Sequence, residues 1–232
     1  MPLRRISLGA SMQKQHIQRS AGYGGIAFVV VAIAGAVLPS MPPDSTARMG
    51  EIAAYLNAHR STWILSTWFA LPAGAFFLWF AAGLNAYLLA VRDSDEALLS
   101  WGNAGAISAA TMYFTLSAIQ AALVYHKAPP GGSDFLRGGF DVLNILTAYF
   151  FAPLAVFVGA ASLNARRHGA LPRWITSLGF LAVAVDIIAT LAPLFRAGPL
   201  APGSYCVIVG FFVPMLWILA ISIAMVRTPI SR

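Results

Sequence analysis

The stretch that decides the fold is Tyr205-Cys-Val-Ile-Val-Gly-Phe-Phe-Val-Pro-Met-Leu-Trp-Ile-Leu-Ala-Ile-Ser-Ile-Ala-Met-Val226, which contains no charged residue. A helix needs about 20 apolar residues to cross the ~30 Å hydrocarbon core of a bilayer. This run therefore predicts a membrane-spanning helix. Five further apolar runs, separated by short polar segments, precede it at 23–38, 63–91, 98–125, 140–163 and 174–195.

The composition agrees with a protein that lies almost entirely in a membrane. Of the 232 residues, 59% are hydrophobic and 10% are charged, whereas soluble domains average about 25% charged residues. Six spans leave too few residues for a separate soluble domain. We therefore expect an all-α protein with one six-helix membrane domain at 21–228, preceded by a basic cytoplasmic leader at 1–20.

The net charge of +7 is spread over the ends of the apolar runs. No basic stripe with interleaved aromatic residues is present, so a nucleic-acid partner is not expected. If the N-terminus is inside, ten basic residues lie inside and five outside. The inside set is Arg4, Arg5, Lys14, Arg19, Arg92, Arg166, Arg167, Arg173, Arg227 and Arg232; the outside set is Arg48, Arg60, Lys127, Arg137 and Arg196. This asymmetry predicts that both termini are cytoplasmic.

The first outer loop contains the pattern of a short amphipathic helix. Asp44 or Ser45 can cap its beginning, and it would end near His59. One face of this helix carries Met49, Ile52, Ala53 and Leu56. We expect the helix to lie on the membrane surface or over the outer mouth of the bundle.

Three of the runs have one face of small and polar residues. In 98–125 the face is Asn103, Ala106, Ala110, Tyr113, Ser117 and Gln120; in 140–163 it is Asp141, Asn144, Ala148, Ala152, Ala155, Gly159 and Ser162; in 174–195 it is Thr176, Gly179, Val183, Asp186, Thr190 and Pro193. Bulky residues such as Leu116, Phe157 and Leu181 lie opposite and are predicted to meet lipid. We expect the three small-residue faces to converge around an outward-opening cavity beneath the short helix.

Asp186 is the only acidic residue deep within a run, about 14 Å from its outer boundary at about 1.5 Å of rise per residue. A charge at such a depth costs at least about 2.5–3.5 kcal/mol, and no lysine or arginine is placed to neutralise it. We expect the side chain to face the interior as a neutral acid. It either carries a proton or anchors a ligand, or it holds helices together by bonding Ser117, Asn144 or a carbonyl freed by a proline.

Catalytic and metal-binding patterns are absent from the runs. The four histidines, His16, His59, His126 and His168, lie outside them or at their edges, which argues against a haem-binding bundle. A cluster of His59 and His126 with Asp134 and Asp141 is the one metal arrangement left open. The single Cys206 excludes an intrachain disulfide. No catalytic residue, metal ligand or cofactor is predicted, and an enzyme ranks behind a binding protein.

Three segments carry a resemblance to a known group of proteins: Glu51-Ile-Ala-Ala-Tyr-Leu-Asn-Ala-His-Arg60, Phe77-Leu-Trp-Phe-Ala-Ala-Gly-Leu84 and Gly169-Ala-Leu-Pro-Arg-Trp174. The whole chain resembles a large group of uncharacterised bacterial six-helix membrane proteins, known as a domain of unknown function. The resemblance implies a six-helix fold in the bacterial inner membrane, and it implies no activity or site residues. Asp186 lies outside the three segments.

The function we expect is that of a binding or accessory membrane protein, with a small apolar molecule or a lipid in its cavity. The candidate ligand-binding residues are Asp186, Asn144, Asp141, Gln120, Ser117 and Tyr113. Two alternatives stay open. One is a small proton-coupled transporter in which Asp186 titrates and Pro72, Pro153 and Pro214 act as hinges. The other is a structural subunit that docks onto another membrane protein through its small-residue faces.

Overall fold

The computed structural model describes residues 2–39, 42–43, 46–129 and 131–227, and within these it contains helices and no strand. The helices are α1 (Pro2–Val37), α2 (Met49–Ala58), α3 (Arg60–Leu89), α4 (Glu96–Tyr125), α5 (Asp134–Arg167), α6 (Arg173–Thr190), the 3-10 turn η1 (Ala192–Leu194) and α7 (Tyr205–Arg227). Six of them are long and apolar enough to cross a membrane. The prediction of an all-α protein with six spans is confirmed.

The first helix is longer than its apolar run. Its backbone is helical from Pro2, while the part that is apolar enough to span a membrane begins at His16. Adding a residue to an existing helix costs little compared with starting one, which explains why the polar leader continues the helix. The predicted division into a leader and a membrane domain therefore falls inside one continuous helix.

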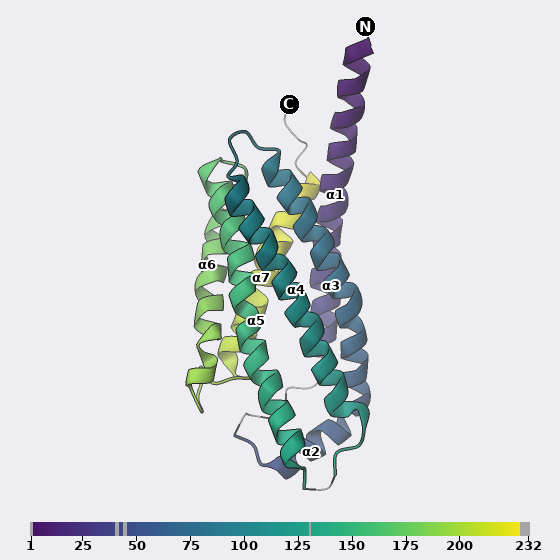
Figure 1. Ribbon diagram of the computed structural model, residues 1–232, viewed down its shortest axis with the longest axis vertical. Helices are drawn as coiled ribbons and strands as arrows, with labels where there is room; N and C mark the ends of the chain where they lie inside the picture. Colours follow the sequence, from purple (N-terminus) through teal and green to yellow (C-terminus); the bar gives the residue numbers. More distant parts are fainter. Residues whose placement is uncertain (1, 40–41, 44–45, 130, 228–232) are drawn as a thin grey trace.

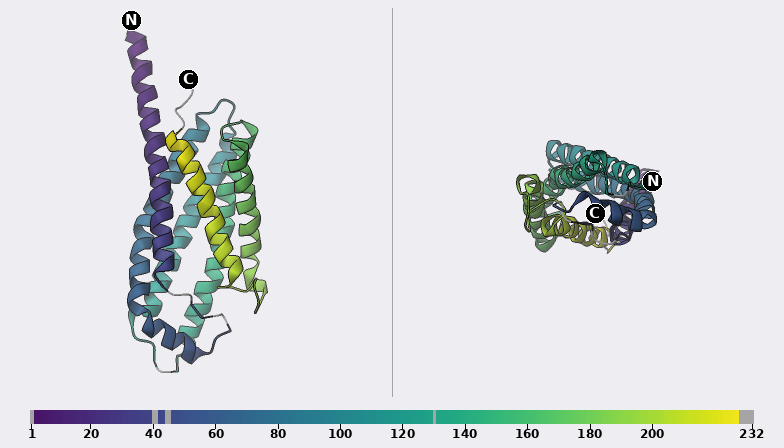
Figure 2. Two further views of the ribbon diagram at one scale, coloured as in Figure 1. Left: turned by 180° about the vertical axis from the view of Figure 1, so that it is seen from behind. Right: turned by 90° about the horizontal axis from the view of Figure 1, so that it is seen from below.

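The six spanning helices form a closed ring. Each packs beside the next along the chain, and α7 returns to pack against α1. The view along the bundle shows this ring, with α2 crossing one end of it (Figure 2). Short connections make consecutive helices antiparallel neighbours, and an even number of helices keeps this alternation where the ring closes. The beginning of α1 and the end of α7 therefore lie at the same end of the bundle (Figure 1).

Small residues allow neighbouring helices to approach closely. A Cβ atom added to Gly105 of α4 would lie 2.8 Å from the carbonyl oxygen of Pro153 and 2.9 Å from the amide nitrogen of Phe157 in α5. Backbone thus packs directly on backbone where α4 meets α5. Such contacts stabilise bundles in lipid, where burial of apolar side chains gives no hydrophobic gain between helices.

A cluster of aromatic side chains fills the centre of the ring. The ring of Phe157 lies edge-on to Phe77, Phe80 and Trp217, with centroids 5.6, 6.3 and 5.8 Å away. The expectation that Phe157 faces lipid is therefore wrong. Helix α5 packs on α4 and α6 and also contacts α3 and α7, and no residue of its stretch 153–165 is exposed.

The prediction for α4 holds for the small residues Ala106 and Ala110, which are buried, but not for Leu116 opposite them. Leu116 is buried, and the exposed face carries Ile107, Thr111 and Thr115. The Thr111 hydroxyl donates to the Ile107 carbonyl and the Thr115 hydroxyl donates to the Thr111 carbonyl, both at 2.9 Å. Because these hydroxyls are satisfied within their own helix, they can face lipid without an unpaired polar group.

Helix α2 covers the end of the bundle opposite the chain termini (Figures 1 and 2). Its buried side chains Ile52, Ala53 and Leu56 belong to one apolar cluster with Trp63 and Phe140. This confirms the short helix and most of its predicted apolar face. The helix begins after Arg48, whose amide donates to the Glu51 carboxylate at 3.3 Å; the predicted caps Asp44 and Ser45 lie outside the described residues.

Candidate functional site

A cavity lies inside the ring, between α1, α3, α4, α5 and α7. It is small, with a cavity volume of about 20 Å³. Its lining includes Ala32, Gly74, Ala110, Phe150, Phe211 and Met215. On α1, α3 and α4 small residues alternate with the rings of Phe28, Phe77 and Tyr113, and the space remains where the small residues fail to fill the centre.

The lining of this central cavity is apolar. Tyr113 of α4 contributes the one polar side-chain group among the lining residues, and its ring packs against Phe150 with centroids 6.2 Å apart. Neither a charge nor an amide from a side chain faces the space. Pockets that hold small molecules are mostly apolar with a few polar groups that fix orientation, and this cavity suits an uncharged, largely hydrocarbon molecule.

Of the predicted site residues, Tyr113 alone lines the central cavity. Ser117, one turn further along α4, donates its hydroxyl to the Tyr113 carbonyl at 2.9 Å. Gln120 donates its amide to the Ser66 hydroxyl of α3 at 2.6 Å. Ser117 is therefore satisfied within α4, and Gln120 joins α4 to α3. Both side chains lie between the cavity and the end covered by α2.

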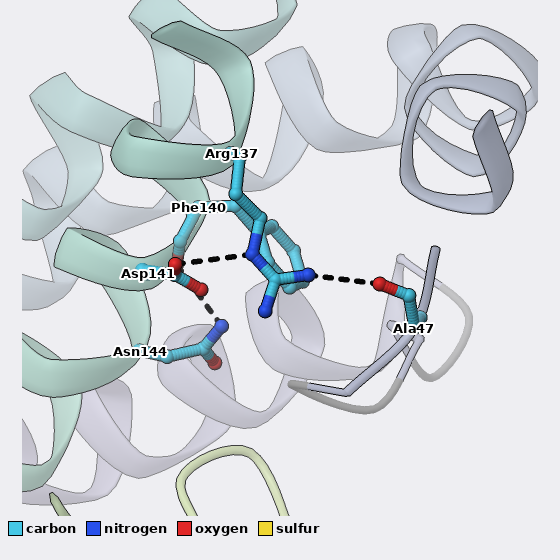
Figure 3. Close-up of polar contacts among 5 residues, drawn as sticks. All are labelled: Ala47, Arg137, Phe140, Asp141 and Asn144. Atoms are coloured by element: carbon cyan, nitrogen blue, oxygen red, sulfur yellow. Dashed lines mark hydrogen bonds and ion pairs between the residues drawn. The ribbon is translucent and has the colours of Figure 1, made fainter. Parts of the chain in front are cut away.

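Asp141 and Asn144 belong to a different group, near the beginning of α5 at the end covered by α2 (Figure 3). Arg137 Nε lies 3.1 Å from Asp141 Oδ2, and Arg137 Nη1 donates to the Ala47 carbonyl at 2.8 Å. The Asn144 amide donates to the Phe140 carbonyl at 3.0 Å. The group ties the segment before α2 to α5. Arg137 was missed as a partner, although its i,i+4 spacing from Asp141 on a helix is the usual signal of such a pair.

Asp186 faces the protein interior, as its small-residue face predicts. The residue is completely buried, as are Thr176 and Ala182 on the same side of α6, while Leu181 and Ile187 on the other side are exposed. Neither carboxyl oxygen has a hydrogen-bond partner among the described residues. The interior placement is confirmed, and no side chain holds the acid.

The three small-residue faces do not meet in one cavity. Helix α6 packs on α5 and α7, whereas α4 packs on α3 and α5. The central cavity has no lining residue from α6, and the expected partners Ser117 and Asn144 bond carbonyls of their own helices. The candidates thus fall into three places: the cavity and its α3–α4 border, the beginning of α5, and the contact of α6 with α5 and α7.

The histidines and acids do not assemble into a metal site. Within the described residues, no three side chains from histidine, cysteine, aspartate and glutamate are placed to hold a metal ion. Asp141 pairs with Arg137, and His59 Nδ1 lies 3.0 Å from the Tyr55 carbonyl oxygen. The open arrangement of His59, His126, Asp134 and Asp141 is therefore not formed.

Comparison with known protein families, curated proteins and solved structures gives no significant match to this chain. The resemblance to bacterial six-helix proteins stays a prediction. What the structure supports directly is a multi-pass membrane protein with a ring of six helices around a small apolar cavity.

Proposed function

We propose that this protein binds a small apolar molecule, or the tail of a lipid, in the central cavity of its six-helix ring. The observation that carries the proposal is the wholly apolar space between α1, α3, α4, α5 and α7, which the ring of Tyr113 helps to line. The bilayer supplies such molecules at high local concentration, so a weak site is enough to be occupied.

The aromatic lining supports this proposal. A molecule that leaves lipid for the cavity gains no hydrophobic energy, because both surroundings are apolar. Its preference for the cavity must come from close packing, and rings such as Phe28, Phe77 and Phe211 offer flat, rigid surfaces for it. The site therefore favours a flat or unbranched molecule over a bulky one.

The setting we propose is the bacterial inner membrane, with both termini in the cytoplasm. The ten-to-five distribution of basic residues favours this orientation. Helix α2 and the Arg137–Asp141 group would then face the periplasm. A ligand held in the cavity would lie between α2 on the outer side and the Phe157 aromatic cluster on the inner side.

The test is photolabelling of the full chain in lipid nanodiscs with a short alkyl diazirine. We expect labels on cavity residues such as Phe150 and Phe211. Ala110→Phe fills the cavity and should abolish these labels, while Ala118→Phe, at an exposed position of the same helix, should leave them unchanged. Labels confined to lipid-facing residues, or equal labelling in both variants, would overturn the proposal and favour a structural subunit.

A further inference from the structure

We propose that Asp186 is a proton-binding site between α5, α6 and α7, separate from the central cavity, and that it holds its proton at neutral pH. The observation behind it is a completely buried carboxyl group whose two oxygens have no partner among the described residues. Buried charges in proteins are paired or neutralised, so a proton, a metal ion or another cation must neutralise this carboxylate.

The neighbouring helices bring no charge to Asp186. Close packing of Gly159 with Val183 aligns α5 with α6, and close packing of Gly210 with Ala189 aligns α7 with α6. Between these contacts, the stretches 150–165 of α5 and 207–226 of α7 contain no residue that titrates. The same is true of η1 (Ala192–Leu194).

The titratable residues of these two helices lie at their ends, apart from Tyr149 in the middle of α5. On α5 they are Asp134, Arg137, Asp141, Tyr149, Arg166 and Arg167, and on α7 they are Tyr205, Cys206 and Arg227. Tyr149 and Tyr205 are exposed, Asp141 pairs with Arg137, and Arg166 donates to Thr176 near the beginning of α6. None of them is placed to neutralise the buried acid.

A metal ion does not fit this place. Calcium and magnesium ions are bound by about six or more oxygen ligands, and the buried residues one turn before and after Asp186 on α6, Ala182 and Ala189, offer none from their side chains. Ser162 packs against Gly179, two turns away along α6, and the Thr190 hydroxyl donates to the Ile187 carbonyl.

An organic cation does not fit either. Ala182 and Ala189 are buried, and Gly210 of α7 packs closely against Ala189. Neither the central cavity nor the smaller one beside Asn85 and Asn103 is lined by a residue of α6. A proton needs no room, so it is the occupant that suits the packing.

One carbonyl of α7, close to its contact with α6, lacks its helical donor. Pro214 lacks the amide that would bond the carbonyl of Gly210, one turn earlier in α7. Gly210 packs against Ala189 of α6, which is less than one turn from Asp186. When the carboxyl group loses its proton, it can no longer donate a hydrogen bond. It then carries an unpaired charge at a dry contact between helices. Release of the proton should therefore admit water between α6 and its neighbours.

Infrared spectroscopy of the full chain in nanodiscs at neutral pH tests this directly. Of the eight acidic residues, Asp186 is the one that lies deep within an apolar run. We expect one carbonyl band of a protonated carboxylic acid in the wild type, and we expect it to shift in D₂O because the proton exchanges. Asp186→Asn should remove the band, and Asp141→Asn should retain it.

The outcomes separate cleanly. Absence of the band from the wild-type spectrum at neutral pH means that Asp186 is ionised and overturns the proposal, whether or not the variants fold. A band that never shifts in D₂O identifies a sealed structural acid and overturns it as well. Ala110→Phe, the variant that fills the central cavity, does not alter α6. The infrared result is therefore independent of whether the central cavity binds a ligand.

Discussion

Asn57 and Ala128 hold each other by two hydrogen bonds. The Asn57 side-chain amide donates to the Ala128 carbonyl at 3.0 Å, and the Ala128 amide donates to the Asn57 side-chain oxygen at 2.9 Å. The pair joins the end of α2 to the loop after α4, and Arg60 strengthens the same corner by donating to the carbonyls of Val124 and Tyr125. This corner fixes α2 over the end of the bundle.

Asn57→Ala should loosen α2 without unfolding the ring. Each bond contributes about 0.5–1.5 kcal/mol net, so their loss should raise hydrogen exchange of the α2 amides by about 10- to 100-fold. Asn57→Asp keeps the acceptor for the Ala128 amide and should give a smaller increase. Exchange in α2 that is the same in wild type and Asn57→Ala would show that its apolar face alone holds it.

Arg137→Gln should free the segment before α2. The variant loses the ion pair with Asp141 and the bond to the Ala47 carbonyl, and a charged hydrogen bond contributes about 1.5–3 kcal/mol. Trypsin should then cut after Arg48 about ten times faster. The matched control is Arg196→Gln, an exposed residue in the outer loop between α6 and α7, which should not change this rate.

Gly105→Ala should separate α4 from α5. The added Cβ atom meets backbone of Pro153 and Phe157, which cannot move aside as a flexible side chain can, and overpacking of this kind costs about 1–3 kcal/mol. We expect a lower midpoint of thermal unfolding in detergent. Gly138→Ala, in a helical position with nothing within 4 Å of the new atom, should leave the midpoint unchanged or raise it.

Asp186→Leu should destabilise the contact of α6 with α5 and α7, whereas Asp186→Asn should fold normally. Leucine is larger than aspartate at a site enclosed by buried alanines, while the amide keeps both shape and hydrogen-bonding capacity. Thermal unfolding and the yield of monodisperse protein in detergent compare the two. Equal loss of stability in both variants would mean that the carboxyl group itself is required for packing.

The orientation in the membrane can be tested with single cysteines in a Cys206→Ser background. Lys127 in an outer loop and Asp93 in an inner loop are both exposed. A membrane-impermeant maleimide added to intact cells should label Lys127→Cys, and it should label Asp93→Cys only after the cells are opened. The reverse pattern would place the termini outside.

The sequence was sufficient for features that depend on one helix at a time. Apolar length predicted six spans, a local pattern predicted α2, and the small-residue face of 174–195 predicted that Asp186 is buried. The exposed face of α4 was not predictable in this way, because Thr111 and Thr115 satisfy their hydroxyls within the helix and so face lipid despite being polar.

The separation of the candidate residues has a different cause. Whether Ser117 and Asp186 share a cavity depends on which helices are neighbours in the ring, and periodicity within one helix contains no information about this. In a ring ordered along the chain, α4 and α6 are held apart by α5. The cavity consequently formed where small residues of α1, α3 and α4 face each other, and two of those helices had not been considered as its walls.

The closed ring has one boundary that the polypeptide does not cross. Every other pair of neighbouring helices is joined by a connection, but α1 and α7 are held only by packing, such as Gly22 against Val226, and by bonds such as that from the Gln18 amide to the Met225 carbonyl at 2.9 Å. Parting these two helices stretches no loop, whereas parting any other pair does. A hydrocarbon chain moving sideways between the bilayer and the interior meets the least covalent restraint at this seam.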